Sequence, residues 1–173
     1  MGKSKEEIEA VLSQLVGQPL VDMTRAADTG IFGFGEKKRG RSPLGRERMV
    51  ESYSLHVQCP WRIVASDGIV VGSRDIYFPA GEGSQLPDDF EWDVAGANRC
   101  DERTERFLDS LKTPLIVESI GVDRLGGVVI QFQEEMRLEI VPDCSLSSEL
   151  WRFFEPGRGK EHFIVGGTPS RIS

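Results

Sequence analysis

The sequence has few of the residues that usually carry chemistry. Among its 173 residues there are three cysteines, two histidines, two tyrosines and three tryptophans. An odd number of cysteines at unrelated spacings does not predict a disulfide framework. No apolar run approaches the roughly 18 residues that cross a bilayer, and the opening MGKSKEEIEA lacks the apolar core of a secretory signal. We therefore expect a cytoplasmic protein with reduced thiols and no membrane partner.

The usual catalytic and cofactor motifs are also missing. There is no G-x-S-x-G nucleophile turn, and GIFGFGEKK departs from both common phosphate-binding patterns. His56 and Cys59 are three residues apart on a predicted strand, so their side chains point to opposite faces and do not chelate one ion. A structural zinc site normally needs four such ligands. We predict no metal, no cofactor and no catalytic residue, which favours a protein that is not an enzyme.

Charge is distributed unevenly along the chain. The net charge is −7, but the segment Glu36–Arg48 contains six basic and two acidic residues, or +4, which leaves −11 for the rest. An acidic body repels polyphosphate, so duplex nucleic acid is a poor partner. The stretch Lys37–Arg48 is predicted to be a solvated loop and is the only candidate for RNA. It has no aromatic residue on which a base would stack, which disfavours that partner.

Hydrophobic patterning predicts short strands and two helices. Ser4 and Glu7 form a capping-box pattern, and the apolar residues from Ile8 onward recur at helical spacing until Gly17. A second helix is expected over Asp101–Leu111, and a short one near Ser148–Phe153. The remaining apolar segments alternate as strands do. The predicted fold class is α+β, with antiparallel β meanders packed against two helices.

Two parts of the chain resemble each other. LSQLVGQPLV near the N-terminus matches LDSLKTPLIV, and YSLHVQCP matches MRLEIVP further along. One interpretation is a single α+β domain over residues 1–173 built from two similar halves, about 4–78 and 98–167, joined by a loop at 79–97. Each half would then be a duplicated α-β-β-β unit. Short β segments also match by chance, so the alternative is one domain without a repeat.

The stretch SYSLHVQCPWRI, residues 52–63, gathers rare residue types. Alternation places Leu55 and Val57 on a buried face and His56 on a polar face. A hairpin is expected at Asp67-Gly68, which brings Arg74 or Asp75 of the following segment near Trp61 and Arg62. These residues are either a cross-strand ion pair beside a packed tryptophan, or one wall of a binding surface.

A resemblance extends over about Leu15 to Gly167. The strand LHVQCPWR and the late segment GGVVIQFQEEMRLEIVPD resemble a group of small bacterial proteins with no assigned activity, a domain of unknown function. Some similar small α+β proteins are immunity partners of bacterial toxins, so the resemblance implies protein binding. Relative to that pattern, KKRGRSPLGRER looks like a variable insertion.

Two functions follow from these observations as expectations. The first is a non-enzymatic protein that binds another protein, such as an immunity-type inhibitor, through an exposed patch at Trp61, Arg62 and Arg74. The alternative is a small-ligand-binding protein or enzyme with a cleft between the two halves, lined by His56, Arg62 or Asp75. A homodimer formed through an uncovered sheet edge is a further expectation.

Overall fold

The computed structural model describes residues 3–41, 47–81, 83 and 85–167. It contains two α-helices and antiparallel sheets, which confirms the predicted α+β class. The helices are α1 (Lys5–Leu12), which continues as the 3₁₀ turn η1 (Ser13–Leu15), and α2 (Arg99–Ser110). A second 3₁₀ turn, η2 (Ser73–Tyr77), directly follows the seventh strand.

The strands form two five-stranded sheets and one hairpin. Sheet I has the order β1 (Leu20–Ala26), β2 (Thr29–Phe34), β5 (Tyr53–Val57), β11 (Glu149–Phe154) and β12 (Phe163–Gly166). Sheet II has the order β7 (Gly68–Gly72), β6 (Trp61–Ala65), β10 (Arg137–Ile140), β9 (Val128–Phe132) and β8 (Val117–Val122). The hairpin pairs β3 (Lys38–Arg41) with β4 (Glu47–Val50).

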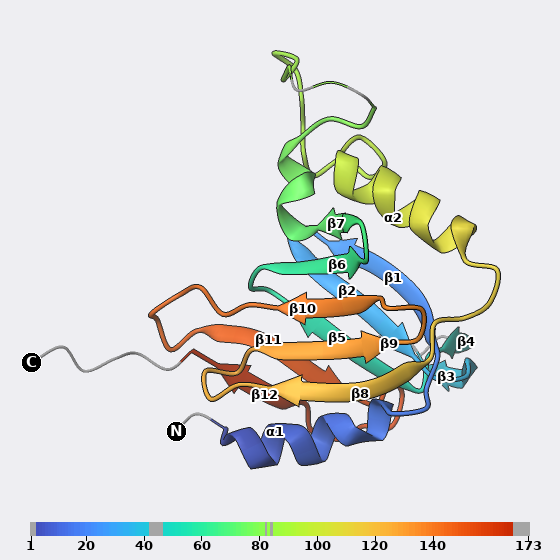
Figure 1. The fold of residues 1–173 in the computed structure, drawn as a ribbon, viewed down its shortest axis with the longest axis vertical. Coiled ribbons are helices and arrows are strands. Elements are labelled where there is room, and N and C mark those ends of the chain that lie inside the picture. Colours follow the sequence, from blue (N-terminus) through green and yellow to red (C-terminus); the bar gives the residue numbers. More distant parts are fainter. Residues whose placement is uncertain (1–2, 42–46, 82, 84, 168–173) are drawn as a thin grey trace, which may run out of the picture.

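The two sheets lie face to face, and α1 and α2 lie at opposite ends of the sandwich (Figure 1). Side chains at alternate positions of both sheets point into one shared core. Leu55 and Trp151 of sheet I and Ile63 and Leu138 of sheet II are each completely buried. The alternation predicted for residues 53–57 is therefore correct, because Leu55 and Val57 face the core and His56 faces outward.

The two halves of the chain have the same order of elements. Each begins with a helix, continues as a three-stranded meander (β1-β2-β5 or β8-β9-β10), and ends with a hairpin. Each hairpin then pairs with the other half's meander: β6–β7 joins β10, and β11–β12 joins β5. The predicted meanders are present in both sheets. Whether this order arose from a duplicated unit stays a prediction.

The N-terminal helix begins as its sequence predicts. The hydroxyl oxygen of Ser4 accepts from the Glu7 backbone N–H at 3.2 Å, and the Glu7 carboxylate accepts from the Ser4 N–H at 2.8 Å. Ile8, Leu12 and Leu15 are buried. The helix α1 lies along β8, below it in Figure 1. The second helix begins at Asn98, whose side-chain oxygen accepts from the Asp101 N–H at 2.9 Å.

Two local predictions are wrong. The segment predicted as a short helix, Ser148–Phe153, is strand β11, because Trp151 and Phe153 alternate with outward residues and pair with β5. The basic segment Lys37–Arg48 is not a plain loop, since residues 38–41 form β3 and residues 47 and 48 begin β4, which pairs with it. Gly40 leaves room there for the buried Val50 side chain, which a Cβ atom would meet at 2.5 Å. Residues 42–46 of that segment lie outside the described residues.

Candidate functional site

The tryptophan expected on an exposed patch is inside the protein. Trp61 is only 5% exposed, and its indole packs edge-to-face on Phe32 with ring centroids 5.0 Å apart. Gly30 makes this possible, because a Cβ atom there would lie 2.4 Å from Trp61 Nε1. The expected patch with an exposed aromatic at Trp61 is therefore not present.

Arg62, next along β6, points outward and pairs across the sheet. Its guanidinium forms an ion pair with Glu139 of β10, and its side chain is 48% exposed. Burial raises the pKa of Glu139, but hydrogen bonds from Arg137 and Arg62 outweigh it, so the net pKa is below the ordinary value. Of the two interpretations drawn from the sequence, Arg62 therefore fits the cross-strand ion pair. Its partner is Glu139, not Arg74 or Asp75.

Arg74 and Asp75 lie in the turn η2, where Asp75 has a structural role. Its carboxylate accepts from the Gly72 backbone N–H at 2.9 Å and lies 4.0 Å from the Arg99 guanidinium. In the described part of the chain no ion pair joins either residue to Arg62. The structure therefore does not assemble Trp61, Arg62, Arg74 and Asp75 into one site.

His56 lies on the outward face of sheet I, away from the buried Trp61. It contacts Phe154, with ring centroids 4.9 Å apart, and it borders a groove of about 770 Å³ together with Ser54. Cys59, its suggested partner for a metal, is buried, and burial raises the pKa of its thiol to about 12. Among the described residues, no cluster of three or more His, Cys, Asp or Glu side chains is arranged to hold a metal ion.

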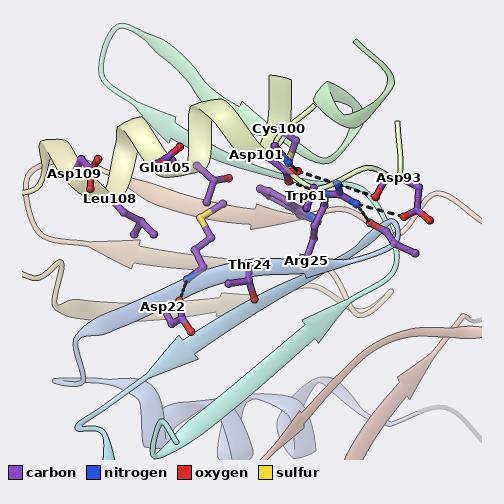
Figure 2. Close-up of a pocket in the computed structure, with 15 residues that line it drawn as sticks. Asp22, Thr24, Arg25, Trp61, Asp93, Cys100, Asp101, Glu105, Leu108 and Asp109 are labelled. Atoms are coloured by element: carbon purple, nitrogen blue, oxygen red, sulfur yellow. Dashed lines mark hydrogen bonds and ion pairs between the residues drawn. The ribbon is translucent and has the colours of Figure 1, made fainter. Parts of the chain in front are cut away.

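A pocket of about 600 Å³ lies between β1 of the first half and α2 of the second half (Figure 2). Its volume is within the range of small-molecule sites. Apolar or weakly polar side chains contribute much of its wall: Met23, Ala27, Trp61, Ala95, Cys100, Thr104 and Leu108. We call this the β1–α2 pocket. The alternative function expected from the sequence was a ligand site in a cleft between the two halves, and this pocket lies between them. Of the five site residues singled out from the sequence, only Trp61 lines the pocket.

One arginine fixes the end of the β1–α2 pocket. Arg25 of β1 donates two hydrogen bonds to Asp101 of α2, from Nε at 2.6 Å and from Nη2 at 2.8 Å. Its remaining donor atom, Nη1, donates to the Ala27 carbonyl at 3.0 Å. Nη2 also lies 3.4 Å from the carbonyl oxygens of Trp92 and Val94. Each nitrogen of the guanidinium thus already has protein partners, so Arg25 is not a free anion-binding group.

Asp101 connects this arginine to the start of α2. Its carboxylate also accepts from the Gly96 backbone N–H at 2.8 Å and from the Asn98 side-chain amide at 3.1 Å. Burial alone would raise the pKa of Asp101. The hydrogen bonds and the charge of Arg25 lower it by more, so the net pKa is below its ordinary value. Asp101 is ionised at neutral pH and holds α2 against β1.

Carboxylates form a row along the pocket. Asp101, Glu105 and Asp109 are spaced four residues apart on α2 and therefore share one helix face. Asp22 of β1 also borders the pocket, but its side chain lies on the side of the strand away from α2 (Figure 2). Only Asp101 of this row is paired with a cation among the described residues. The rim therefore has a negative potential that favours a positively charged group.

The pocket contains no activated nucleophile among its described residues. Cys100 is buried, and burial raises the pKa of its thiol to about 11, so it is protonated at neutral pH. The Trp61 indole N–H has no hydrogen-bond acceptor within the described structure.

The sequence contains part of the signal for this pocket. The four-residue spacing of Asp101, Glu105 and Asp109 is readable within the predicted helix. Arg25 gives no comparable signal, because nothing in its neighbourhood indicates that a helix 76 residues later supplies its partner. The pocket depends on that long-range contact.

Comparisons with known proteins give no further assignment. A scan of protein-family models and searches of curated proteins and of solved structures returned no significant match to this chain. In the part of the chain that the structure describes, no helix has both the length and the apolar character needed to cross a membrane.

Proposed function

We propose that this chain is a non-enzymatic binding protein whose site is the β1–α2 pocket. The observation that supports the proposal is a 600 Å³ cavity with largely apolar walls at the junction of the two halves. Such cavities, with few convergent charged groups, are the usual form of small-molecule sites. The row of carboxylates on its rim selects a ligand with an apolar body and a positively charged end, such as an arylalkyl amine.

Arg25 does not neutralise the row of carboxylates on α2. Its guanidinium is shared between Asp101 and backbone carbonyls, which leaves Glu105 and Asp109 of α2 without a cationic partner at the cavity mouth among the described residues. Trp61 in the wall adds an aromatic surface, and aromatic faces attract cations. An anionic ligand of the same shape would meet like charges and bind more weakly.

The test uses three probes of one shape: phenethylamine, phenethyl alcohol and phenylpropionate. We expect protection against thermal unfolding in that order, with phenethylamine the strongest. Ala95→Trp should abolish the protection, because Ala95 is exposed and lines the cavity mouth. Ala10→Trp is the matched control, since Ala10 is exposed on α1. No protection by any probe, or equal protection in the Ala95→Trp variant, would contradict the proposal.

Binding to another protein is the second candidate. Large apolar side chains are exposed on the segment formed by residues 77–97, which leads from the end of η2 to α2. They are those of Tyr77, Phe78, Leu86 and Val94. This segment projects from one end of the sandwich (Figure 1). Exposed apolar side chains gathered on one segment are typical of protein-interaction sites, and this segment replaces the Trp61–Arg74 patch as the candidate. An immunity-type role would be supported if the chain suppresses a toxin encoded beside its gene and Leu86→Asp does not.

A further inference from the structure

A second hollow lies on the outward face of sheet I, with a volume of about 770 Å³. It is bordered by β4 on one side and by residues 155–160, between β11 and β12, on another. Both histidines of the chain, His56 and His162, line it. We call it the histidine groove.

Strand register defines the floor of the histidine groove. One row across the sheet contains Asp22, Gly33, Ser54 and Phe154, which are direct partners on β1, β2, β5 and β11. The next outward row contains Ile31 and His56. Gly33 has no side chain, and the Asp22 and Glu51 side chains cover it, because a Cβ atom on Gly33 would lie 3.1 Å from a carbon of each. Both carboxylates therefore lie next to Ser54, the direct partner of Gly33 on β5.

Ser54 provides the observation that points to an occupant. It is 1% exposed and lines the groove, yet its hydroxyl has no hydrogen-bond partner within the described residues. Buried hydroxyls are normally paired, and an unpaired one is a cost that a ligand group removes. If position 54 only filled space beneath the groove, an alanine would pack there equally well and would leave no unpaired hydroxyl.

The histidines form an aromatic wall with Phe154. The His162 ring stacks on Phe154 with centroids 4.0 Å apart, and His56 meets the same ring edge-on. Burial lowers the pKa of His56, and the nearby Arg152 and His162 lower it further, while Glu51 and Glu149 oppose them. His56 is therefore neutral at neutral pH and has one N–H to donate.

Cations and carboxylates lie at different parts of the groove. Arg48 and Lys160 come from the flanking β4 and from the segment after β11, beside the most basic stretch of the chain. Lys160 and Arg158 both pair with Glu155, which leaves one positive charge in excess there. The carboxylates of Asp22 and Glu51 lie by Gly33 instead.

We propose that the histidine groove binds a small phosphorylated sugar. The phosphate would accept from His56, Arg48 and Lys160, and the sugar hydroxyls would bond to Ser54, Asp22 and Glu51. Carboxylates are good acceptors for sugar hydroxyls, and cationic side chains together with an imidazole donor suit phosphate. This site shares Asp22 and Thr24 of β1 with the border of the β1–α2 pocket, but it lies on the outward face of sheet I and does not depend on the function of that pocket.

Two histidines make a direct assay possible. Ribose 5-phosphate is titrated at neutral pH while the imidazole C–H resonances are followed by NMR, with His162→Gln used to assign them. We expect both resonances to shift, and ribose 5-phosphate to bind at least about tenfold more tightly than inorganic phosphate or ribose alone. Binding should also raise the pKa of His56, because an anion stabilises its charged form.

Ser54→Ala should weaken ribose 5-phosphate binding by about three- to tenfold, the effect of one hydrogen bond. This variant is expected to fold, since Ser54 has no partner to lose. Ser66→Ala, at an exposed hairpin turn, is the matched control for Ser54→Ala. The proposal is overturned if the resonances do not move, if inorganic phosphate binds as tightly as ribose 5-phosphate, or if Ser54→Ala binds as tightly as the wild type.

Discussion

The contact between Gly30 and Trp61 shows how one small residue sets the pocket wall. Gly30 faces the core from β2, and the indole of Trp61 occupies the space where a side chain would otherwise be. Phe32 closes the other side of the ring with an edge-to-face contact. The position of Trp61, and with it part of the β1–α2 pocket, depends on this absent methyl group.

Gly30→Ala is expected to lower the free energy of unfolding by about 1–3 kcal/mol, the usual cost of overpacking a core. Its Cβ atom would lie 2.4 Å from Trp61 Nε1 and 2.8 Å from Cε2, and both atoms belong to a rigid ring that must shift as a whole. Urea unfolding measures the change. Gly121→Ala on β8 is the matched control, because its nearest contact would be an ordinary 3.9 Å and it should cost little. Equal stability of both variants would show that the indole is loosely held.

A second prediction concerns the turn between β9 and β10. Glu134 and Glu135 both have positive φ, 62° and 58°, a conformation that costs most residues about 1–2 kcal/mol. Glu135→Gly should therefore raise the free energy of unfolding, by about 0.5–1 kcal/mol after the entropy of the unfolded glycine is counted. Asp67→Gly serves as control at a turn residue without positive φ, and we expect it to be slightly destabilising. A destabilised Glu135→Gly would mean that the glutamate side chains hold the turn.

Positive φ angles occur in a different hairpin turn from the one whose residues favour them. Asp67-Gly68 is the stronger hairpin signal, and a hairpin is indeed present there. However, the two turn residues are Ser66 and Asp67, and neither has a positive φ. The turn with two left-handed residues is built from glutamates, which no propensity rule selects. Strand pairing imposed that conformation against local preference.

At the scale of elements, the ion pair between Arg25 and Asp101 fastens α2 to β1. Asp101→Asn should lower the free energy of unfolding by about 1.5–3 kcal/mol, because hydrogen bonds to charged groups are lost. The folded-state pKa of Asp101 is below its ordinary value, so its stabilisation is complete above the unfolded pKa of about 4. That stabilisation is lost as the pH falls through the lower folded value.

The difference in unfolding free energy between wild type and Asp101→Asn should accordingly be constant from neutral pH to about pH 5 and shrink below about pH 4. Asp109→Asn is the matched control, since Asp109 is on the same helix face and has no ion pair among the described residues. A difference that does not depend on pH would show that Asp101 has the same pKa in the folded and unfolded states, so that Arg25 does not stabilise its charged form.

Elements with a strong local pattern were predictable. Strand β5 was expected from alternation at residues 53–57 and occurs there, and the capping box of α1 is formed. Strand β11 was mistaken for a helix because ELWRFF is nearly all large apolar residues, and only its partners β5 and β12 make it extended. Short apolar segments take their conformation from neighbours that sequence distance hides.

The whole molecule is organised by the exchange of hairpins between the two halves. The antiparallel meanders could be inferred from sequence, but the exchange could not, since it is set by which sheet edge each hairpin completes. The β1–α2 pocket has the same origin, because its two walls come from different halves. Local patterns thus predicted the parts of the fold, and the long-range packing that creates the site was outside their reach.

This exchange predicts that neither half folds alone. A break after Gln85, in the exposed joining segment, separates β11–β12 from the meander that they complete and leaves each partial sheet with an uncovered apolar face. Fragments 1–85 and 86–173 should each lack cooperative thermal unfolding by circular dichroism. Mixed in equal amounts, they should form a one-to-one complex with the cooperative transition of the intact chain. An isolated fragment that unfolds cooperatively would show that a half is stable without its exchanged hairpin, and the pocket between the halves would then be an interface between two independent units.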